Sequence, residues 1–175
     1  MANEKFPSSE ESTHEQIQGE IRDYRFFDIR GIVHKEFVPP GQTVNHAFYK
    51  DALEQLRKRV QRVRMDVSDD WVLQTDNAPA HTALSIREIL SKKNIPVLPH
   101  PPYSPDLAPC DFYLFPKLKS KLKGHHFKTE NILKILTDEL NTLTENDFKD
   151  CYDQWKKRSN HCVTSQGSYF EGDNL

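Results

Sequence analysis

Alternating and helically spaced apolar residues divide the first half of the chain into three elements. The run YRFFDIRGIVHKEFV from Tyr24 onward predicts two strands joined by a tight turn at residues 28–31, where Gly31 can supply the positive φ that such turns need. PPGQT then ends the second strand. Between Asn45 and Arg64 the spacing predicts a helix with one buried stripe, made of Phe48, Tyr49, Ala52, Leu53, Leu56, Val60 and Val63.

The second half of the chain continues this alternation of strands and helices. WVLQ (71–74) and IPVLP (95–99) predict short strands, and Pro79 begins a helix that continues to a C-terminal cap at Asn94. After the proline-rich loop HPPYSPDLAPC, the spacing predicts helices from about residue 111, over residues 130–143 and over residues 146–158. This order is typical of a layered α/β or α+β domain, in which ligands gather at the carboxyl ends of strands.

The composition fits one globular domain with a polar extension. A chain of 175 residues can bury a sizeable core, although 29% of its residues are charged. Residues 1–22 are acidic and serine-rich, which predicts a mobile tail, and residues 23–175 then form the domain. No apolar run is long enough for a bilayer, and the first residues lack the apolar core of a secretory signal. We expect an intracellular protein, in the nucleus or cytoplasm, with no membrane partner.

The three cysteines, Cys110, Cys151 and Cys162, are an odd number and include no CxxC pair. This usage predicts reduced thiols rather than a disulfide framework. Cys151, His161 and Cys162 lie close together in the sequence, as zinc ligands often do. A closed zinc site, however, uses four ligands in paired spacings, and the sequence does not offer that pattern.

The net charge of −2 hides a basic segment. Residues 112–129 contain no acidic residue and five lysines: Lys117, Lys119, Lys121, Lys123 and Lys128. Such a segment is consistent with two interpretations, a surface that contacts nucleic-acid phosphates or an ordinary solvated helix face. In the first case, binding to DNA would depend strongly on salt.

Two aspartates follow predicted strands. Asp76 comes directly after the strand at residues 71–74, and Asp111 stands where the helix after the proline-rich loop begins. A strand–helix–strand–loop unit can bring these carboxylates together, and paired carboxylates suit Mg²⁺ or Mn²⁺ and metal-assisted phosphodiester chemistry. Each aspartate also fits a plain capping or turn role, so the spacing alone leaves both interpretations open.

Longer stretches around these aspartates resemble the catalytic domain of mariner-type transposases. TDNAPAHTA (75–83) and LPHPPYSPDLAPCDFYLFPKLK (98–119) resemble the family's second and third carboxylate blocks, at the spacing the family shows. GIVHKEFVPPGQTVNHAFY (31–49) and QWKKRSNHCVTSQGSYFEGDN (154–174) resemble its second hairpin with the first core helix and its C-terminal end. The resemblance covers residues 25–174 and implies an RNase H-like mixed sheet flanked by helices, metal-dependent DNA cleavage and transfer, and DNA transposon ends and a homodimer as partners.

The resemblance also implies roles for particular residues. Asp76 matches the second acidic ligand of a Mg²⁺ or Mn²⁺ site and Asp111 matches the third. Asn77 and His81 match polar positions beside the second aspartate, where they could orient water or DNA, or could serve packing and capping. Asp106 matches a loop position that the family does not use as a ligand, and its Ser-Pro-Asp context favours a turn.

One part of the family pattern is missing from this sequence. The first carboxylate normally lies in a Gly-Asp-Glu strand upstream of the hairpin, and upstream of Tyr24 only QGEI (18–21) and Asp23 come near it. Asp28 matches a turn aspartate and is a poor substitute. We therefore expect weak metal binding and no activity from this chain alone. A non-catalytic DNA- or protein-binding module that uses residues 117–128, and a nuclease completed by another chain, are the alternatives.

Overall fold

The computed structural model describes residues 22–39, 41–122 and 129–166, with side chains omitted at Arg22 and at residues 121–133. The predicted tail at residues 1–22 therefore lies almost entirely outside the described residues, and its boundary stays a prediction. The elements are β1 (Arg22–Asp28), β2 (Gly31–Val38), α2 (His46–Val63), η1 (Met65–Val67), β3 (Leu73–Gln74), α3 (Pro79–Thr82), α4 (Leu84–Lys92), β4 (Val97–Leu98), η2 (Pro105–Leu107), η3 (Cys110–Leu114), α5 (Phe115–Leu122), α6 (Thr129–Thr142) and α7 (Glu145–Thr164).

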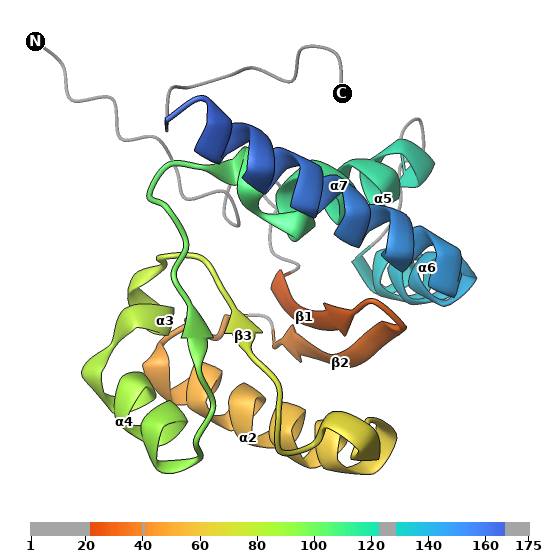
Figure 1. Cartoon of the computed structure of the whole chain (residues 1–175). Helices are drawn as coiled ribbons and strands as arrows, with labels where there is room; N and C mark the ends of the chain where they lie inside the picture. Colours follow the sequence, from red (N-terminus) through yellow and green to blue (C-terminus); the bar gives the residue numbers. More distant parts are fainter. Residues whose placement is uncertain (1–21, 40, 123–128, 167–175) are drawn as a thin grey trace, which may run out of the picture.

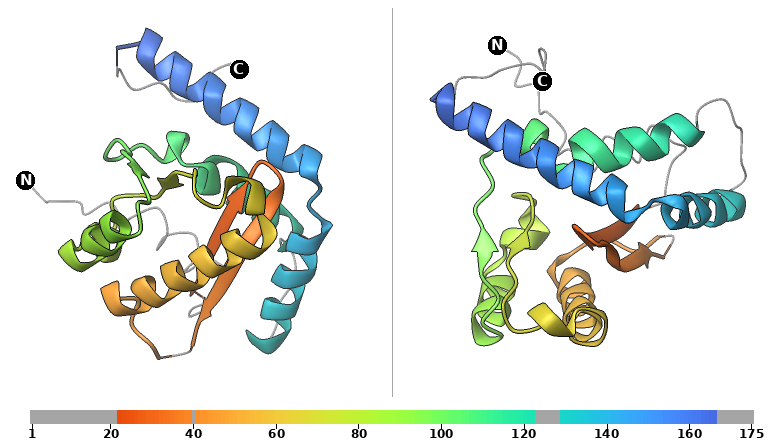
Figure 2. Two further views of the ribbon diagram at one scale, coloured as in Figure 1. Left: turned by 60° about the horizontal axis from the view of Figure 1, so that its bottom comes forward. Right: turned by 45° about the vertical axis from the view of Figure 1, so that its right-hand side comes forward.

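The predicted hairpin is confirmed as β1 and β2, which pair antiparallel from Arg22↔Val38 to Asp28↔Gly31. Gly31 has a φ of 131°, the positive value that the turn requires. The Asp28 carboxylate accepts a hydrogen bond of 2.8 Å from the backbone N–H of Arg30, which closes the turn. The hairpin is the centre of the molecule, with helices on both of its faces (Figures 1 and 2).

Side chains alternate between the two faces of this hairpin, as they must in strands. Tyr24 of β1 and Val33 of β2 belong to the buried cluster that contains α2, α4 and β3. Phe27 and Ile32 pack instead against the cluster on η3, α5 and α6. Both faces of the hairpin are therefore covered, by different helices on each side.

Helix α2 forms where the apolar stripe predicts it. Asn45 caps its N-terminus, because the Asn45 side-chain oxygen accepts the backbone N–H of Phe48 at 3.0 Å. Its buried face consists of Tyr49, Ala52, Leu53, Leu56 and Val60. Helices α3 and α4 lie beside α2 (Figure 1).

The single helix predicted from Pro79 to Asn94 is wrong in one respect, since the structure divides it into α3 and α4. Ala83 is extended, with φ −56° and ψ 144°, and its carbonyl starts α4 by accepting the N–H groups of Ile86 and Arg87. The predicted cap at Asn94 is confirmed, because Asn94 has a φ of 53° and donates its N–H to Ser91. Ile95 donates to Leu90, which completes a Schellman motif.

Strands β3 and β4 form a short parallel pair, Leu73↔Val97 and Gln74↔Leu98, separate from the hairpin. After the proline-rich loop, the helix predicted from residue 111 begins as the π-helical turn η3 and continues as α5. α6 agrees with its predicted range, whereas α7 continues past the predicted end at residue 158 to Thr164. None of the helices described is long and apolar enough to cross a bilayer.

Candidate active site

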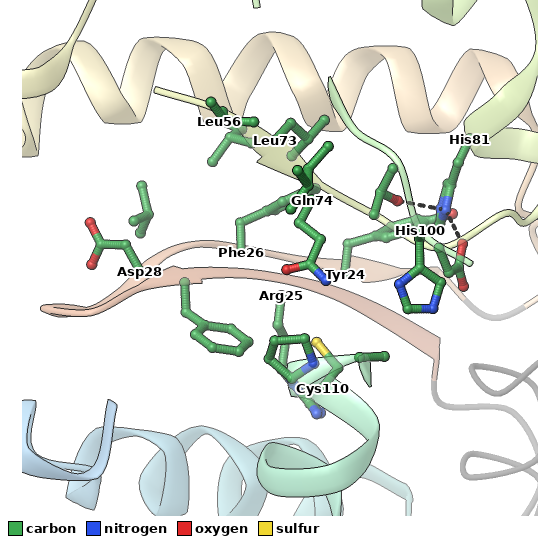
Figure 3. A pocket seen from close by; sticks show the side chains of 18 of the residues that line it. Tyr24, Arg25, Phe26, Asp28, Leu56, Leu73, Gln74, His81, His100 and Cys110 are labelled. Atoms are coloured by element: carbon green, nitrogen blue, oxygen red, sulfur yellow. Dashed lines mark hydrogen bonds and ion pairs between the residues drawn. The ribbon is translucent and has the colours of Figure 1, made fainter. Parts of the chain in front are cut away.

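A cavity of about 980 Å³ lies between the hairpin and β3 (Figure 3). Its walls come from β1, from α2 on one side, from η3 and α7 on the other side, and from the residues around β3. Asp76, two residues after the end of β3, and Asp111, the second residue of η3, both line it. The structure thus brings to one cavity the two aspartates that the sequence singles out. Asp106, on η2, does not line it.

Asp76 is held by a network of its own loop. His81 Nδ1 lies 2.5 Å from Asp76 Oδ1, and the backbone N–H of Ala78 donates to the same oxygen at 2.9 Å. The His81 side chain is only 2% exposed and that of Asp76 15%. The predicted neighbour His81 is therefore in direct contact with the carboxylate, which fixes the orientation of Asp76 before any ligand arrives.

The electrostatic environment keeps the Asp76 carboxylate charged. Burial alone would raise the pKa of Asp76, but the hydrogen bond and charge of His81 and the Ala78 N–H act in the opposite direction. The pKa of Asp76 is lowered from its ordinary value as a result. Burial lowers the pKa of His100, another residue lining the cavity, despite the nearby charge of Asp76.

The network extends to two residues that the sequence did not identify as part of the site. Thr75 Oγ1 lies 2.9 Å from His81 Nδ1, and the Tyr49 hydroxyl donates to Thr75 Oγ1 at 3.4 Å. The Tyr49 ring also lies against His81, with 4.1 Å between ring centroids. The apolar stripe of α2 predicts a buried Tyr49, but nothing in that spacing shows what its hydroxyl contacts.

Asn77, unlike His81, contacts the proline-rich loop and not Asp76. Its side-chain amide donates to the backbone carbonyl of His100 at 2.8 Å, so it ties the loop after β3 to the proline-rich loop. Gln74 makes a second tie, from its side-chain nitrogen to the carbonyl of Leu107 at 3.3 Å. These two bonds hold the segment before Asp111 against the segment that carries Asp76.

The predicted DNA-binding lysines are only partly described. The Lys117 ammonium pairs with the Asp147 carboxylate and donates to the Tyr113 hydroxyl at 3.2 Å, so α5 is tied to α7. Lys119 is exposed on α5. The side chains of Lys121, Lys123 and Lys128 lie outside the described part. The role of these lysines in binding DNA stays a prediction, and Lys117 has an evident structural role.

The described side chains do not form a ready-made metal site. Within residues 22–39, 41–122 and 129–166 there is no group of three His, Cys, Asp or Glu side chains that could hold a metal ion. Two carboxylates on one cavity fit the donor set of Mg²⁺, which commonly binds one or two carboxylates and keeps several waters. They are not a preformed cage. Burial raises the pKa of the Cys151 thiol to about 12, which disfavours a thiolate ligand for zinc.

Comparison with known proteins identifies the region that carries Asp76 and Asp111. Residues 34–134 match the family described as DDE superfamily endonuclease. The chain is 34% identical to the mariner Mos1 transposase of Drosophila mauritiana over 154 residues, which are 83% of this chain and 44% of that protein. The chain thus spans less than half the length of this curated relative.

Solved structures extend the likeness from sequence to fold. The Mos1 transposase paired-end complex with the left transposon end matches with a TM-score of 0.78 and 34% identity, over 86% of this chain and 45% of that chain. The Mos1 catalytic domain with raltegravir and Mg matches with a TM-score of 0.77 and 29% identity, over 98% of this chain and 100% of that chain. A corresponding structure contains Mn. The predicted RNase H-like fold class is confirmed.

Proposed function

Since the chain belongs to the DDE superfamily endonucleases and resembles the catalytic domain of a mariner transposase, we propose that Asp76 and Asp111 are two carboxylate ligands of a divalent metal site for phosphodiester cleavage and transfer in DNA. The observation that carries this proposal is that both line one cavity, from blocks separated by residues 77–110. The related catalytic domain has been solved with Mg and with Mn, which supports either ion.

The bound metal would lower the pKa of a water or hydroxyl and stabilise the leaving oxygen of the phosphodiester. The protein's own contribution at Asp76 is preorganisation. His81 and the Ala78 N–H hold Oδ1, and the lowered pKa keeps the carboxylate in its charged, ligating form at neutral pH. Asn77 acts indirectly, because its hydrogen bond to the His100 carbonyl positions the loop that leads to Asp111.

Asp76 and Asp111 alone would make a weak site. We therefore expect the 175-residue chain to bind Mg²⁺ or Mn²⁺ weakly and to cleave DNA little by itself. In this proposal DNA transposon ends are the substrate, since a relative has been solved in a paired-end complex with the left transposon end. The same complex supports a second copy of the chain as a partner.

Calorimetric titration of the full chain with Mn²⁺ tests the metal site directly, with cleavage of end-labelled DNA as a second measurement. Asp76→Asn and Asp111→Asn are each expected to abolish the binding heat. Asp106→Asn is the matched control, because Asp106 lies between these blocks but does not line the cavity. Equal Mn²⁺ binding by wild type, Asp76→Asn and Asp111→Asn would remove the proposed site.

A non-catalytic DNA-binding module remains the second candidate, because Lys119 on α5 is exposed. Lys117 pairs with Asp147, so Lys117 is expected to contribute little to DNA binding. Binding of the chain to duplex DNA at a series of salt concentrations tests the DNA-binding module. A module that binds through phosphates loses affinity steeply as salt rises, whereas a flat response would exclude it.

A further inference from the structure

Thr75, which stands between β3 and Asp76, lines the cavity with a half-buried side chain. Its hydroxyl takes part in two hydrogen bonds. The Tyr49 hydroxyl, on α2, donates to Thr75 Oγ1 at 3.4 Å, and His81 Nδ1, on α3, lies 2.9 Å from the same oxygen (Figure 3). A hydroxyl has two acceptor lone pairs and one proton, so the directions of these two bonds decide where the Thr75 proton can go.

The contact with Asp76 places a proton on His81 Nδ1. Asp76 Oδ1 lies 2.5 Å from Nδ1 and also accepts the backbone N–H of Ala78 at 2.9 Å. In the ionised form that ligates a metal, a carboxylate only accepts hydrogen bonds, so the proton in this short contact belongs to the nitrogen. His81 Nδ1 is therefore a donor and cannot accept a hydrogen bond from the Thr75 hydroxyl.

Thr75 Oγ1 is consequently an acceptor toward both neighbours. Its two lone pairs face the Tyr49 hydroxyl and His81 Nδ1, and its own proton points toward neither of them. Among the described residues, the structure gives this hydroxyl no third hydrogen-bond partner. A ligand in the cavity that Thr75 lines can supply the acceptor for this proton.

We propose that the Thr75 hydroxyl binds the DNA substrate, by donating its proton to a non-bridging oxygen of the phosphodiester at Asp76. This inference rests on the proposed function, in which a metal ion brings the phosphate to that carboxylate. Thr75 Oγ1 and Asp76 Oδ1 contact the same nitrogen of His81, so the two oxygens lie close together. Threonine hydroxyls commonly contact DNA phosphates, whose oxygens accept hydrogen bonds without donating any.

Tyr49 orients this hydroxyl from the packed side of the hairpin. The Tyr49 side chain is 1% exposed and belongs to the large buried cluster, and its ring lies 4.1 Å from that of His81. Because its hydroxyl occupies one lone pair of Thr75 Oγ1, the Thr75 proton is turned away from α2. The core around α2 thereby positions a contact to the substrate.

Nitrogen NMR of the His81 ring tests the premise on the full chain, without metal or DNA. The signal is assigned by its absence from the His81→Gln variant. Nδ1 is expected to give the signal of a protonated ring nitrogen. An unprotonated Nδ1 would accept the Thr75 proton itself, and that result would overturn the proposal.

Thr75→Val and Thr75→Ser form the matched pair for the contact with DNA. Valine keeps the shape of threonine without the hydroxyl, whereas serine keeps the hydroxyl. In the presence of Mn²⁺, fluorescence anisotropy is expected to show that Thr75→Val binds a labelled DNA duplex about tenfold more weakly than the wild type. Thr75→Ser is expected to retain the affinity. Calorimetry without DNA is expected to give Thr75→Val the Mn²⁺ affinity of the wild type.

Tyr49→Phe removes only the hydroxyl that orients Thr75. DNA binding in the presence of Mn²⁺ is expected to weaken by about two- to threefold, because the Thr75 proton is then free to turn away from the phosphate. A higher DNA affinity in Tyr49→Phe would mean that Thr75 donates to Tyr49 in the wild type, which is the reverse of the proposed direction.

Two further outcomes would contradict the proposed contact. Equal DNA affinity of the wild type and Thr75→Val would show that the hydroxyl does not bind the substrate. A loss of Mn²⁺ affinity in Thr75→Val would assign the hydroxyl to the metal site and not to the phosphate. Both leave the proposed function in place if the wild type binds Mn²⁺ and Asp76→Asn does not. A wild type without Mn²⁺ affinity would remove the proposed function, and the contact with it.

Discussion

Among the residues whose side chains are described, the two faces of the β1–β2 hairpin pack against buried clusters of different size. Among the described residues, the face toward α2 and α4 is packed by a cluster of ten buried side chains, and the face toward η3, α5 and α6 by a cluster of three. Asp76 belongs to the first side and Asp111 to the second. The carboxylate on the densely packed side is thus fixed by the fold, whereas the other depends on a small cluster and on loop ties.

The largest effect is expected from truncating the two clusters in turn. Leu56→Ala, in the large cluster, is expected to cost about 3–4 kcal/mol of unfolding free energy, because 3%-exposed Leu56 leaves a cavity that its neighbours cannot collapse. Leu118→Ala, in the small cluster, is expected to cost about 2–3 kcal/mol. Urea denaturation of both variants measures the difference. A larger loss for Leu118→Ala would reverse the comparison.

His81→Ala tests whether the packed side holds Asp76 in place. The variant leaves a buried carboxylate without its closest partner and is expected to cost about 2–3 kcal/mol. A carboxyl with a lowered folded pKa stabilises the protein above its unfolded pKa and loses that contribution as pH falls through the folded pKa. Without His81 the pKa of Asp76 rises, because burial remains. The loss of stability on acidification therefore begins at higher pH.

Carboxyl NMR titration measures the pKa of Asp76 in that variant. Asn77→Ala is the matched control, since exposed Asn77 contacts the His100 carbonyl and not the Asp76 carboxylate. An unchanged Asp76 pKa in His81→Ala would show that the contact with His81 does not set the charge of the site.

Asp147→Asn probes the side of the hairpin that has the smaller buried cluster. Asp147 forms a capping box with Thr144 and pairs with Lys117, and its pKa is lowered to about 2, first by Lys117 and then by Thr144. The stabilisation is complete above the ordinary pKa of 3.8 and is lost as pH falls toward about 2. Loss of the cap and of a partly exposed ion pair is expected to cost about 1 kcal/mol at pH 7.

Denaturation between pH 2 and pH 7 checks this dependence. Asp153→Asn is the matched control, because Asp153 pairs with Lys156 on the exposed surface of the same helix and takes no part in the cap. If both variants show the same pH profile, Asp147 does not anchor α7 to α5.

The smallest effect on stability is expected from Lys119→Ala. Lys119 is exposed, and such a surface change alters the unfolding free energy by about 0.5 kcal/mol or less. If Lys119 contacts a phosphate, the slope of log affinity for DNA against log salt falls by about 1. Fluorescence anisotropy across a salt series measures it, and an unaltered slope would exclude Lys119 from a DNA interface.

Sequence patterns predict the parts of the fold that local physics determines. The hairpin turn needs positive φ at Gly31, α2 needs an N-cap at Asn45 and one apolar stripe, and the Schellman motif needs Asn94, so each could be read from neighbouring residues. The break at Ala83 could not be predicted in this way. Alanine favours a helix, and nothing in its neighbours shows that its backbone is extended.

The candidate site was predictable in its two aspartates and in the neighbours Asn77 and His81. Asp76 and Asp111 stand out by their position after strands and by family resemblance, and their role as metal ligands stays a prediction. Thr75, Tyr49 and the Gln74–Leu107 tie were not predictable, because they depend on which distant side chains the fold brings together. Spacing within one element carries no information on contacts between elements.

The reactivity of Cys151 can report how often the cavity opens. It lines the cavity wall from α7, is 2% exposed and has a thiol pKa of about 12, so in the closed protein it is both shielded and protonated. A thiol reagent can modify it only during the moments when α7 moves away from the hairpin. The rate at which Cys151 is modified therefore measures how often α7 moves away from the hairpin. The measurement uses the natural sequence and needs no introduced label.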